Sequence, residues 1–333
     1  MPDDDTSAWG WGLDLLLFVL LPCALMTGIA YVYMTYFMPQ PYAGVVLQEG
    51  VQYVSARRFE THGLEALAAG GSAIERKAWS PPEIASGIPS TLTILIHGYN
   101  AQEGKVALYF ADLATSLLID ARHVGPLIVF DWPAVSVPLD EQPTAERLRH
   151  DLHSHTKNAW TQPAYEFNAY KMDQRKAESV GVAAFATLLK QLSAKPDTTV
   201  HVIAHSMGCY LLARAMQQHP AAFSRIGSMI WLAPDIDVAE IGEPWFRTVV
   251  ETLRTGLFVH YSHNDTTLSV LSRAANGAPR LGATGPRDGG ASMRKLEFID
   301  MTSALGADKV HTGYLRRNSP SLPLIARQIA IVR

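Results

Sequence analysis

Short, uninterrupted apolar runs rich in β-branched residues alternate with amphipathic stretches along most of this chain. A strand that is apolar on both faces must be covered on both faces, which is typical of parallel sheets in α/β proteins. We therefore predict an α/β fold with a doubly wound, mostly parallel sheet, in one domain over residues 51–333. The predicted strands are 51–57, 74–79, 91–96, 126–130, 199–204, 228–232, 257–261 and 296–299.

Helical spacing of apolar residues fills several of the gaps between these strands. It predicts helices over 106–117, 170–192 and 210–216. Two other segments lack any periodicity. Residues 133–167 are polar and contain Pro, and we interpret them as a candidate lid insertion. Residues 274–292 are rich in Gly, Ala and Pro and predict a mobile surface loop.

The composition excludes several classes of protein. Of 333 residues, 48% are hydrophobic and 18% are charged, which excludes a disordered chain, a coiled coil and a protein of many membrane spans. The formal net charge of -3 provides no basic field of the kind that nucleic-acid binding needs, so no nucleic-acid partner is expected. The two cysteines, Cys23 and Cys209, exclude a disulfide framework and a cysteine zinc site.

One long apolar run stands near the N-terminus. Residues 15–37 contain no charged side chain and exceed the roughly 20 residues that a bilayer-spanning helix needs. They follow a short acidic tail, 1–14, and precede a Pro/Gly linker, 38–50. A cleaved signal peptide needs a basic start, which MPDDD does not provide, and a buried helix would need an unusually large core. We therefore expect a transmembrane helix that anchors the chain in a single pass.

The orientation follows from the first basic residues after this run, Arg57 and Arg58. The acidic tail before the run contains no Lys or Arg. By the positive-inside rule, the large domain is expected on the cytoplasmic side of the membrane.

The sequence VIAHSMG, residues 202–208, joins a predicted strand to a predicted helix through a serine. This context is typical of the nucleophile elbow G-x-S-x-G, in which small flanking residues allow a tight turn that exposes the serine. Ala204 replaces the first glycine and is still small. We predict Ser206 as the nucleophile, and the alternative is a serine that only caps a helix.

The sequence LIHGYN, residues 95–100, follows an earlier predicted strand. In α/β-hydrolases the loop after the third strand supplies one oxyanion-hole N–H, and the residue after the nucleophile supplies the other. The predicted donors are Tyr99, or alternatively Asn100, and Met207. The candidate substrate-binding residues around them are His97, Gly98, Asn100 and His205. For His97, a structural role that bonds the loop through its ring is the favoured alternative.

An acid and a base follow the serine in the chain order that this arrangement requires: Ser, then Asp or Glu, then His. Asp265 ends the turn 262–265 that directly follows the strand LFVHY, and His311 follows the strand LEFI through a loop. We predict these two residues as the acid and the base of a catalytic triad. The competing residues are Asp235, Asp237 and Asp300 for the acid, and His260 and His263 for the base.

The candidate lid carries two further features. His150, His153 and His155 have a spacing that can bind a metal, but a solvated polar loop is favoured, so no metal or other cofactor is predicted. The segment leaves the carboxyl end of a central strand, where α/β sheets bind ligands. We therefore expect it to cover the serine, with Trp160 and Tyr165 lining an acyl pocket.

A series of short motifs occurs in the order found in one bacterial family: HGYN, FDWPA, AHSMG, WLAPDID, YSHND, PRLG and IDMT. Together they make residues 53–314 resemble the α/β-hydrolases of the domain-of-unknown-function nine hundred group. The resemblance implies an α/β-hydrolase fold and a Ser206–Asp265–His311 triad. The chain departs from the family in a longer stretch between 133 and 170, and in Thr-Gly-Tyr after His311, where relatives often have Gly before the histidine. The family has no agreed substrate.

The sequence thus predicts a membrane-anchored serine hydrolase that cleaves carboxylic esters through an acyl-enzyme. Its expected partners are a small-molecule ester or lipid-like substrate and the membrane. Thioesterase and amidase activities use the same triad and stay open. The alternative of a different class is a catalytically silent fold that serves as a membrane-tethered binding or assembly module.

The anchor predicts how the protein fractionates. Because apolar side chains each favour insertion by about 0.3–0.6 kcal/mol at the helix centre, the full chain should stay with membranes through a carbonate wash. A chain that begins near Tyr42 should be soluble. A reporter fused after Arg333 should work as a cytoplasmic fluorophore and be inactive as an exported phosphatase. The reverse pattern would overturn the orientation but not the anchor.

Overall fold

The computed structural model describes residues 51–70, 73–81, 90–99, 101, 106–117, 125–134, 162–193, 198–286, 293–306 and 310–330, which belong to one unit of the chain. The predicted tail, transmembrane helix and linker, residues 1–50, lie outside this part. So do Asn100, Trp160, His150, His153, His155 and most of the candidate lid. No helix within the described residues has the length and hydropathy that a membrane span requires.

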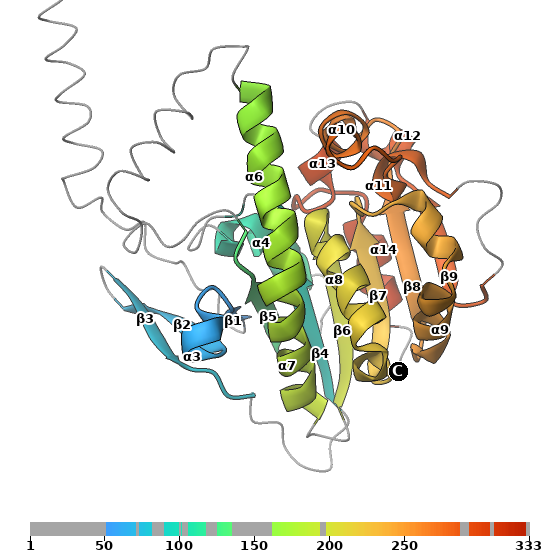
Figure 1. The fold of residues 1–333 in the computed structure, drawn as a ribbon. Coiled ribbons are helices and arrows are strands. Elements are labelled where there is room, and N and C mark those ends of the chain that lie inside the picture. The colour runs from blue at the N-terminus through green and yellow to red at the C-terminus, as the bar shows by residue number, and fades with distance from the viewer. Residues whose placement is uncertain are drawn as a thin grey trace, which may run out of the picture. The chain divides into compact units, whose positions relative to one another are not determined.

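Strands of the described chain form one nine-stranded sheet: β1 (Val51–Ser55), β2 (Glu65–Gly70), β3 (Ala73–Ala78), β4 (Ser90–Ile96), β5 (Leu127–Asp131), β6 (Thr198–His205), β7 (Ile226–Leu232), β8 (Gly256–Tyr261) and β9 (Leu296–Asp300). Their order across the sheet is β3-β2-β1-β5-β4-β6-β7-β8-β9 (Figure 1). β2 is antiparallel to both its neighbours and every other pair is parallel, which confirms the mostly parallel sheet. β2 was not predicted, because its sequence EALAAG is typical of a helix.

The helices of the described chain are α3 (Phe59–His62), α4 (Val106–Thr115), α6 (Gln162–Lys176), α7 (Val182–Ser193), α8 (Met207–Gln218), α9 (Pro244–Thr252), α10 (Arg273–Asn276), α11 (Leu281–Thr284), α12 (Thr302–Leu305), α13 (Val310–Gly313) and α14 (Leu322–Ala330). Short helical turns add η3 (Ala177–Gly181), η4 (Pro220–Phe223), η5 (Val238–Gly242) and η6 (Thr267–Ser272). The helices predicted over 106–117, 170–192 and 210–216 correspond to α4, to the run from α6 through α7, and to α8.

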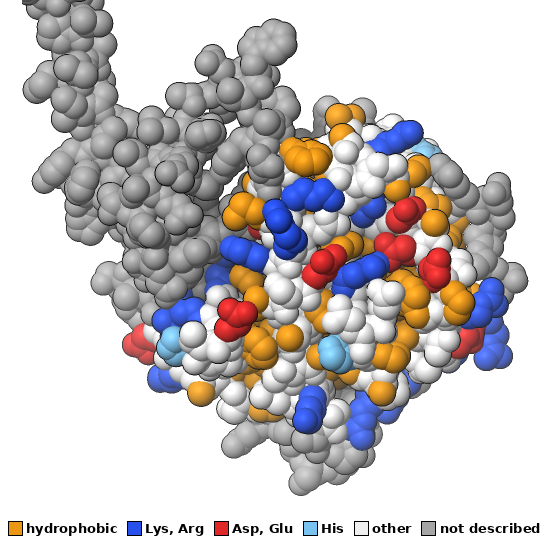
Figure 2. All heavy atoms as spheres, viewed as in Figure 1, with side chains coloured by type: hydrophobic (Ala, Val, Ile, Leu, Met, Phe, Trp, Pro, Cys, Tyr) orange, Lys and Arg blue, Asp and Glu red, His pale blue; other side chains and the backbone are white. Residues whose placement is uncertain are grey.

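The sheet is covered on both faces because its strands alternate two sets of apolar side chains. Ile94, Ile96 and Phe130 pack in one core with α7, α8 and α9, while Leu95 and Ile203 pack in the other with α4 and α14. Burying each such side chain contributes roughly 1.5–3 kcal/mol. Figure 1 shows α7, α8 and α9 in front of the sheet. On that side, the described basic and acidic side chains are interspersed with apolar ones (Figure 2).

The strand order reverses beside β4, and this determines where a site can form. β4 is followed in sequence by β5 on one side, and the chain then crosses back to form β6 on the other side. Ile96 pairs with Ala204 near the ends of these two strands. The loop after β4 therefore meets the turn after β6 at the carboxyl edge of the sheet, which is the usual place for ligands in α/β proteins.

The prediction of a mobile surface loop over 274–292 is wrong for the residues up to 286 that the structure describes. This stretch contains α10 and α11, and the side chains of Arg280 and Leu281 are buried. Its main chain bonds to segments that follow β7 and β8, since Leu281 N donates to the carbonyl of Ile236 and Ser262 N donates to that of Gly282. A Cβ at Gly282 would lie 2.4 Å from a main-chain carbon of Ala233. The small residues therefore permit close packing.

His260 makes the stability of the fold depend on pH. Its ring is buried on β8, its Nε2 bonds to Gln328 Oε1 on α14 at 3.1 Å, and burial lowers its pKa to about 4. An unfolded histidine has a pKa of about 6.5, so between these values the unfolded chain binds more protons than the folded chain. The free energy of unfolding should fall by up to about 3 kcal/mol as the pH drops through this window.

Replacing His260 with Gln keeps an N–H for Gln328 but removes the titration. Urea unfolding of His260→Gln at about pH 7 and about pH 4.5 should show a smaller loss of stability than the wild-type chain shows. Part of the loss should persist, because burial also lowers the pKa of His205. A loss equal to that of the wild-type chain would contradict this account of His260.

Candidate active site

Ser206 lies at a sharp turn between β6 and α8. Its backbone has φ 55° and ψ -122°, which places a non-glycine residue in the left-handed region. Such a conformation costs about 1–3 kcal/mol and persists only where the surroundings impose it. Here Ser206 N donates to the carbonyl of Leu232 at 2.9 Å, and its own carbonyl accepts from Cys209 N and Asp235 N. The turn is thus held by main-chain bonds to β7 and the segment after it.

Small residues are required around this turn. A Cβ at Gly208 would lie 2.5 Å from the carbonyl oxygen of His97, and a Cβ at Gly98 would lie 2.9 Å from Ser206 Cβ. Ala204, which replaces the first glycine of the motif, is fully buried in β6 and packs in the core. The motif therefore needs glycine at position 208, two residues after the serine. Position 204, two residues before the serine, accepts the methyl group of alanine.

A chain of hydrogen bonds joins three side chains at the sheet edge. His311 Nε2 lies 3.0 Å from Ser206 Oγ, and His311 Nδ1 lies 2.7 Å from Asp265 Oδ2. Asp265 is fully buried, and its other carboxyl oxygen accepts from Leu268 N at 3.1 Å. With Nδ1–H donating to the carboxylate, Nε2 is left to accept the serine proton. This is the arrangement that a nucleophile, base and orienting acid require.

The competing acids bond elsewhere. Asp235 pairs with the buried guanidinium of Arg280, with Nε 2.8 Å from Oδ1. Asp237 caps η5 through its side chain. Asp300 is half exposed, and its side chain accepts from a main-chain N–H just after β9. Of the competing bases, His263 is exposed and His260 lies against α14. Of these described candidates, Asp265 and His311 are the acid and the base that hydrogen bonds connect to Ser206.

The predicted oxyanion donors belong to the two segments that meet at Ser206. Tyr99 follows Gly98 in the loop after β4, and Met207 is the first residue of α8. The first N–H groups of a helix have no partner within that helix, and they carry the positive end of its dipole. Negative charge that develops beside Ser206 would therefore face the N-terminus of α8.

His97 has a structural position and does not line the cavity at Ser206. Its ring is fully buried and stacks on Trp132, with ring centroids 5.3 Å apart. Nδ1–H donates to the carbonyl of Gly98 at 2.9 Å, and Nε2 lies 3.1 Å from Asp131 Oδ1. The position of His97 therefore fits the structural role and not contact with a substrate. The ring holds the loop that bears Gly98 and Tyr99.

The carboxylate that contacts His97 belongs to a buried ion pair between Asp131 and Arg57. Arg57 Nε and Nη2 donate to the two carboxylate oxygens of Asp131 at 2.9 Å and 2.8 Å, and both side chains are almost fully buried. Burial alone would raise the pKa of the Asp131 carboxyl, but Arg57 and His97 hold it below its usual value. Arg57 also donates to the carbonyl of Ala101, beyond the loop. The ion pair thus ties β1 and β5 to the loop after β4.

His205 also has a supporting position. Its ring is fully buried, and Nε2–H donates to the main-chain carbonyl of His311 at 2.6 Å. Burial, and then the nearby His311, lower the pKa of His205 well below its usual value, so the ring is neutral. The predicted substrate contact is therefore replaced by a bond that fixes α13, the short helix that carries the base.

A cavity of about 110 Å³ opens beside Ser206 and His311. Its other walls include Tyr99, Tyr170 and a set of residues from η6: Thr267, Leu268, Leu271 and Ser272. The η6 residues were not predicted from the sequence, because nothing in their order marks a wall of a site. Of the predicted pocket residues, Trp160 lies outside the described chain, and Tyr165 is placed only as part of α6. Tyr170 of the same helix does line the cavity.

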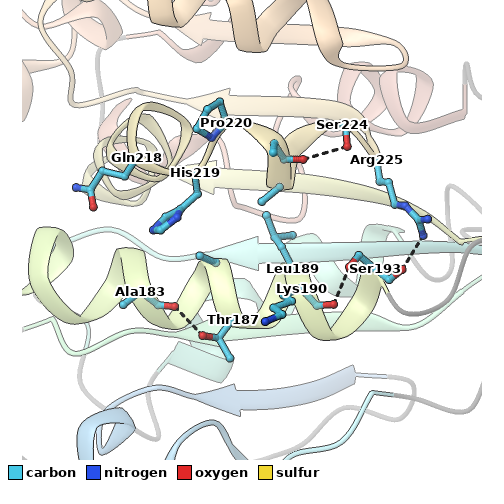
Figure 3. Close-up of a pocket in the computed structure, with 13 residues that line it drawn as sticks. Ala183, Thr187, Leu189, Lys190, Ser193, Gln218, His219, Pro220, Ser224 and Arg225 are labelled. Carbon is cyan, nitrogen blue, oxygen red and sulfur yellow. Dashed lines mark hydrogen bonds between the residues drawn. The ribbon is translucent and has the colours of Figure 1, made fainter.

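A second hollow lies away from these residues. It measures about 810 Å³ between α7 and η4, and its lining includes Thr187, Lys190, His219 and Arg225 (Figure 3). Ser206, Asp265 and His311 do not contribute to it. Within the described residues, no group of three His, Cys, Asp or Glu side chains could hold a metal ion.

The family model described as alpha/beta hydrolase of unknown function (DUF900) matches residues 75–329. The chain belongs to this family. The membership confirms the resemblance seen in the sequence and, with the sheet topology, the α/β-hydrolase fold. Among curated proteins, none matches the chain significantly.

Solved structures with some similarity come from several organisms. A cutinase-like protein from Cryptococcus sp. has 12% identity and a TM-score of 0.37, with 74% of this chain and 96% of that one covered. Lipase B of Aspergillus fumigatus has 12% identity and a TM-score of 0.43, with 75% and 55% covered. The Pyrococcus furiosus esterase Pf2001 has 12% identity and a TM-score of 0.37, with 73% and 83% covered. Similarities this low decide nothing about the activity of the family member described here.

The buried ion pair predicts a large cost for losing one partner. Asp131→Asn leaves the Arg57 guanidinium buried without a countercharge, so the free energy of unfolding should fall by about 3–5 kcal/mol. Lys77→Met is the matched control, because Lys77 and Glu75 form an exposed pair that should contribute about 1 kcal/mol or less. Urea unfolding of both variants gives the comparison. Similar small losses in the two would show that the buried pair is not needed.

Proposed function

We propose that this α/β hydrolase is a serine hydrolase that cleaves carboxylic esters, with Ser206 as nucleophile, His311 as base and Asp265 as the acid that orients it. The observation that carries the proposal is the continuous chain of hydrogen bonds from Ser206 Oγ through His311 to Asp265, at 3.0 Å and 2.7 Å. The strained backbone of Ser206 supports it, because such strain gathers at functional sites.

The reaction would proceed through an acyl-enzyme. Ser206 Oγ attacks the acyl carbon while His311 Nε2 takes its proton, and Asp265 stabilises the imidazolium that forms. The N–H groups of Tyr99 and Met207 would donate to the oxyanion, and each such donor contributes about 2.7–4 kcal/mol. The tetrahedral intermediate then breaks its bond to the alcohol, which receives the proton from His311. Water, activated by the same histidine, attacks the acyl-enzyme and releases the acid and the free serine.

The proposed enzyme is tethered to a membrane by residues 15–37, with the hydrolase domain on the cytoplasmic side. The uncharged run and the basic pair Arg57 and Arg58 support this placement. In the folded domain the Arg57 side chain is buried with Asp131, and the Arg58 side chain is partly buried and paired with Glu65.

The decisive experiment is labelling by a fluorophosphonate probe, followed by turnover of short p-nitrophenyl esters. The wild-type chain should be labelled at Ser206 and should hydrolyse the esters. Ser206→Ala should lose labelling and about 10⁶ in rate while it keeps its circular dichroism spectrum. A wild-type chain that takes up no probe and cleaves no ester would favour a silent binding module. Faster turnover of thioesters or amides than of esters would show that the substrate belongs to one of those classes instead.

The same assay identifies the acid. Asp265→Asn should slow labelling by about 10⁴, because the histidine loses the carboxylate that sets its tautomer. Asp300→Asn is the control, since this acid also lies at the carboxyl end of a strand but bonds to Thr302. Its rate should stay within about tenfold of the wild-type rate, which is ~1.4 kcal/mol in activation free energy. Asp235→Asn should likewise cost less than Asp265→Asn. Greater damage from Asp235→Asn would overturn the assignment of the acid.

A further inference from the structure

The cavity beside Ser206 limits what an acyl-enzyme could hold. Its volume is about 110 Å³. An apolar cavity of about 150 Å³ holds one benzene molecule, so this one has room for about four non-hydrogen atoms. The described residues that line the cavity include Leu268, Leu271, Tyr99 and Tyr170 together with shorter polar residues. It can therefore bury a short hydrocarbon chain but not a long one.

The wall made by η6 is fixed by the site itself. η6 follows Asp265 almost directly, and Leu268 N donates to Asp265 Oδ1 at 3.1 Å. The Leu268 side chain is fully buried. A displacement of this wall would therefore also disturb the carboxylate that orients His311. The η6 wall therefore cannot shift to admit a longer acyl chain without weakening the bond that holds the Asp265 carboxylate.

Another wall is closed by a buried ionic network. Arg280 Nε donates to Asp235 Oδ1 at 2.8 Å, and Tyr170 Oη donates to Asp235 Oδ2 at 2.8 Å. Ser272 Oγ also bonds to Asp235, and Asn276 Nδ2 donates to Tyr170 Oη at 2.7 Å. Both oxygens of this carboxylate are thus satisfied in a place from which water is excluded. A longer chain that entered here would leave buried charges without partners, which is strongly unfavourable.

We propose that the acyl pocket selects short acyl groups, from acetyl to those with about four carbons beyond the carbonyl, and rejects fatty acyl chains. This inference rests on the proposed ester hydrolysis at Ser206. It narrows the expected substrate to a small ester and argues against a long-chain lipid, even for an enzyme tethered to a membrane. The alcohol part of the ester is left unspecified, because the cavity would hold the acyl part.

The test uses the full chain in detergent micelles and p-nitrophenyl acetate, butyrate, octanoate and palmitate. We expect kcat/KM to fall by about 100-fold or more between butyrate and octanoate. A kcat/KM for octanoate equal to or higher than that for butyrate would overturn the proposed short-chain pocket. It would leave the proposal of a serine hydrolase intact. Failure of every ester, together with failure of fluorophosphonate labelling, would overturn the proposed function and this inference with it.

Paired variants on η6 locate the selectivity. Leu271→Ala should enlarge the cavity and shift the octanoate-to-butyrate ratio of kcat/KM upward by about tenfold. Leu271→Trp should fill the cavity and shift the preference toward acetate, so the pair tests the pocket even if one variant folds poorly. Val270→Ala is the matched control, because this neighbouring side chain is 66% exposed. An unchanged ratio in both Leu271 variants, or an equal change in Val270→Ala, would place the acyl chain elsewhere.

Discussion

The close approach of two main-chain segments, at the ends of β4 and β6, is the constraint on which the rest of the site depends. Gly208 lies against the carbonyl groups of Ile96 and His97, and Gly98 lies against Ser206. No side chain fits between them. The loop that follows β4 and the first turn of α8 are therefore brought to the same point, and the serine is forced into a conformation that would be unfavourable alone.

Two buried histidines hold this arrangement from opposite sides. His97 bonds to the main chain of the loop after β4 and rests on Asp131, while His205 bonds to the main chain of His311. Neither ring lines the cavity. Each instead fixes a segment that carries a group proposed to act on the substrate. Preorganised donors and a fixed base are worth more than flexible ones, because no reorganisation is needed when charge develops.

Much of this could be predicted from the sequence, since local patterns carried it. The uninterrupted apolar runs predicted the parallel sheet. The sequence of strand, serine and helix predicted the turn at which the structure has Ser206. Asp265 and His311 followed from chain order and from their positions after strands. Features that depend on long-range packing could not be predicted from local sequence patterns. The sequence EALAAG of β2 pairs as a strand only because β1 and β3 flank it. The Gly- and Ala-rich stretch before 286 suggested mobility, yet its small residues serve burial.

The short η6 turn, which lies between the proposed acid and the pocket, has a consequence for how such enzymes can diverge. Because the main chain of Leu268 binds the Asp265 carboxylate while residues of η6 line the cavity, an insertion in η6 would alter rate and substrate range together. Tyr170, on α6, contacts the cavity from a separate stretch of chain. A larger pocket reached through α6 would leave Asp265 and His311 in place, but it would require a replacement for the buried bond between Tyr170 and Asp235.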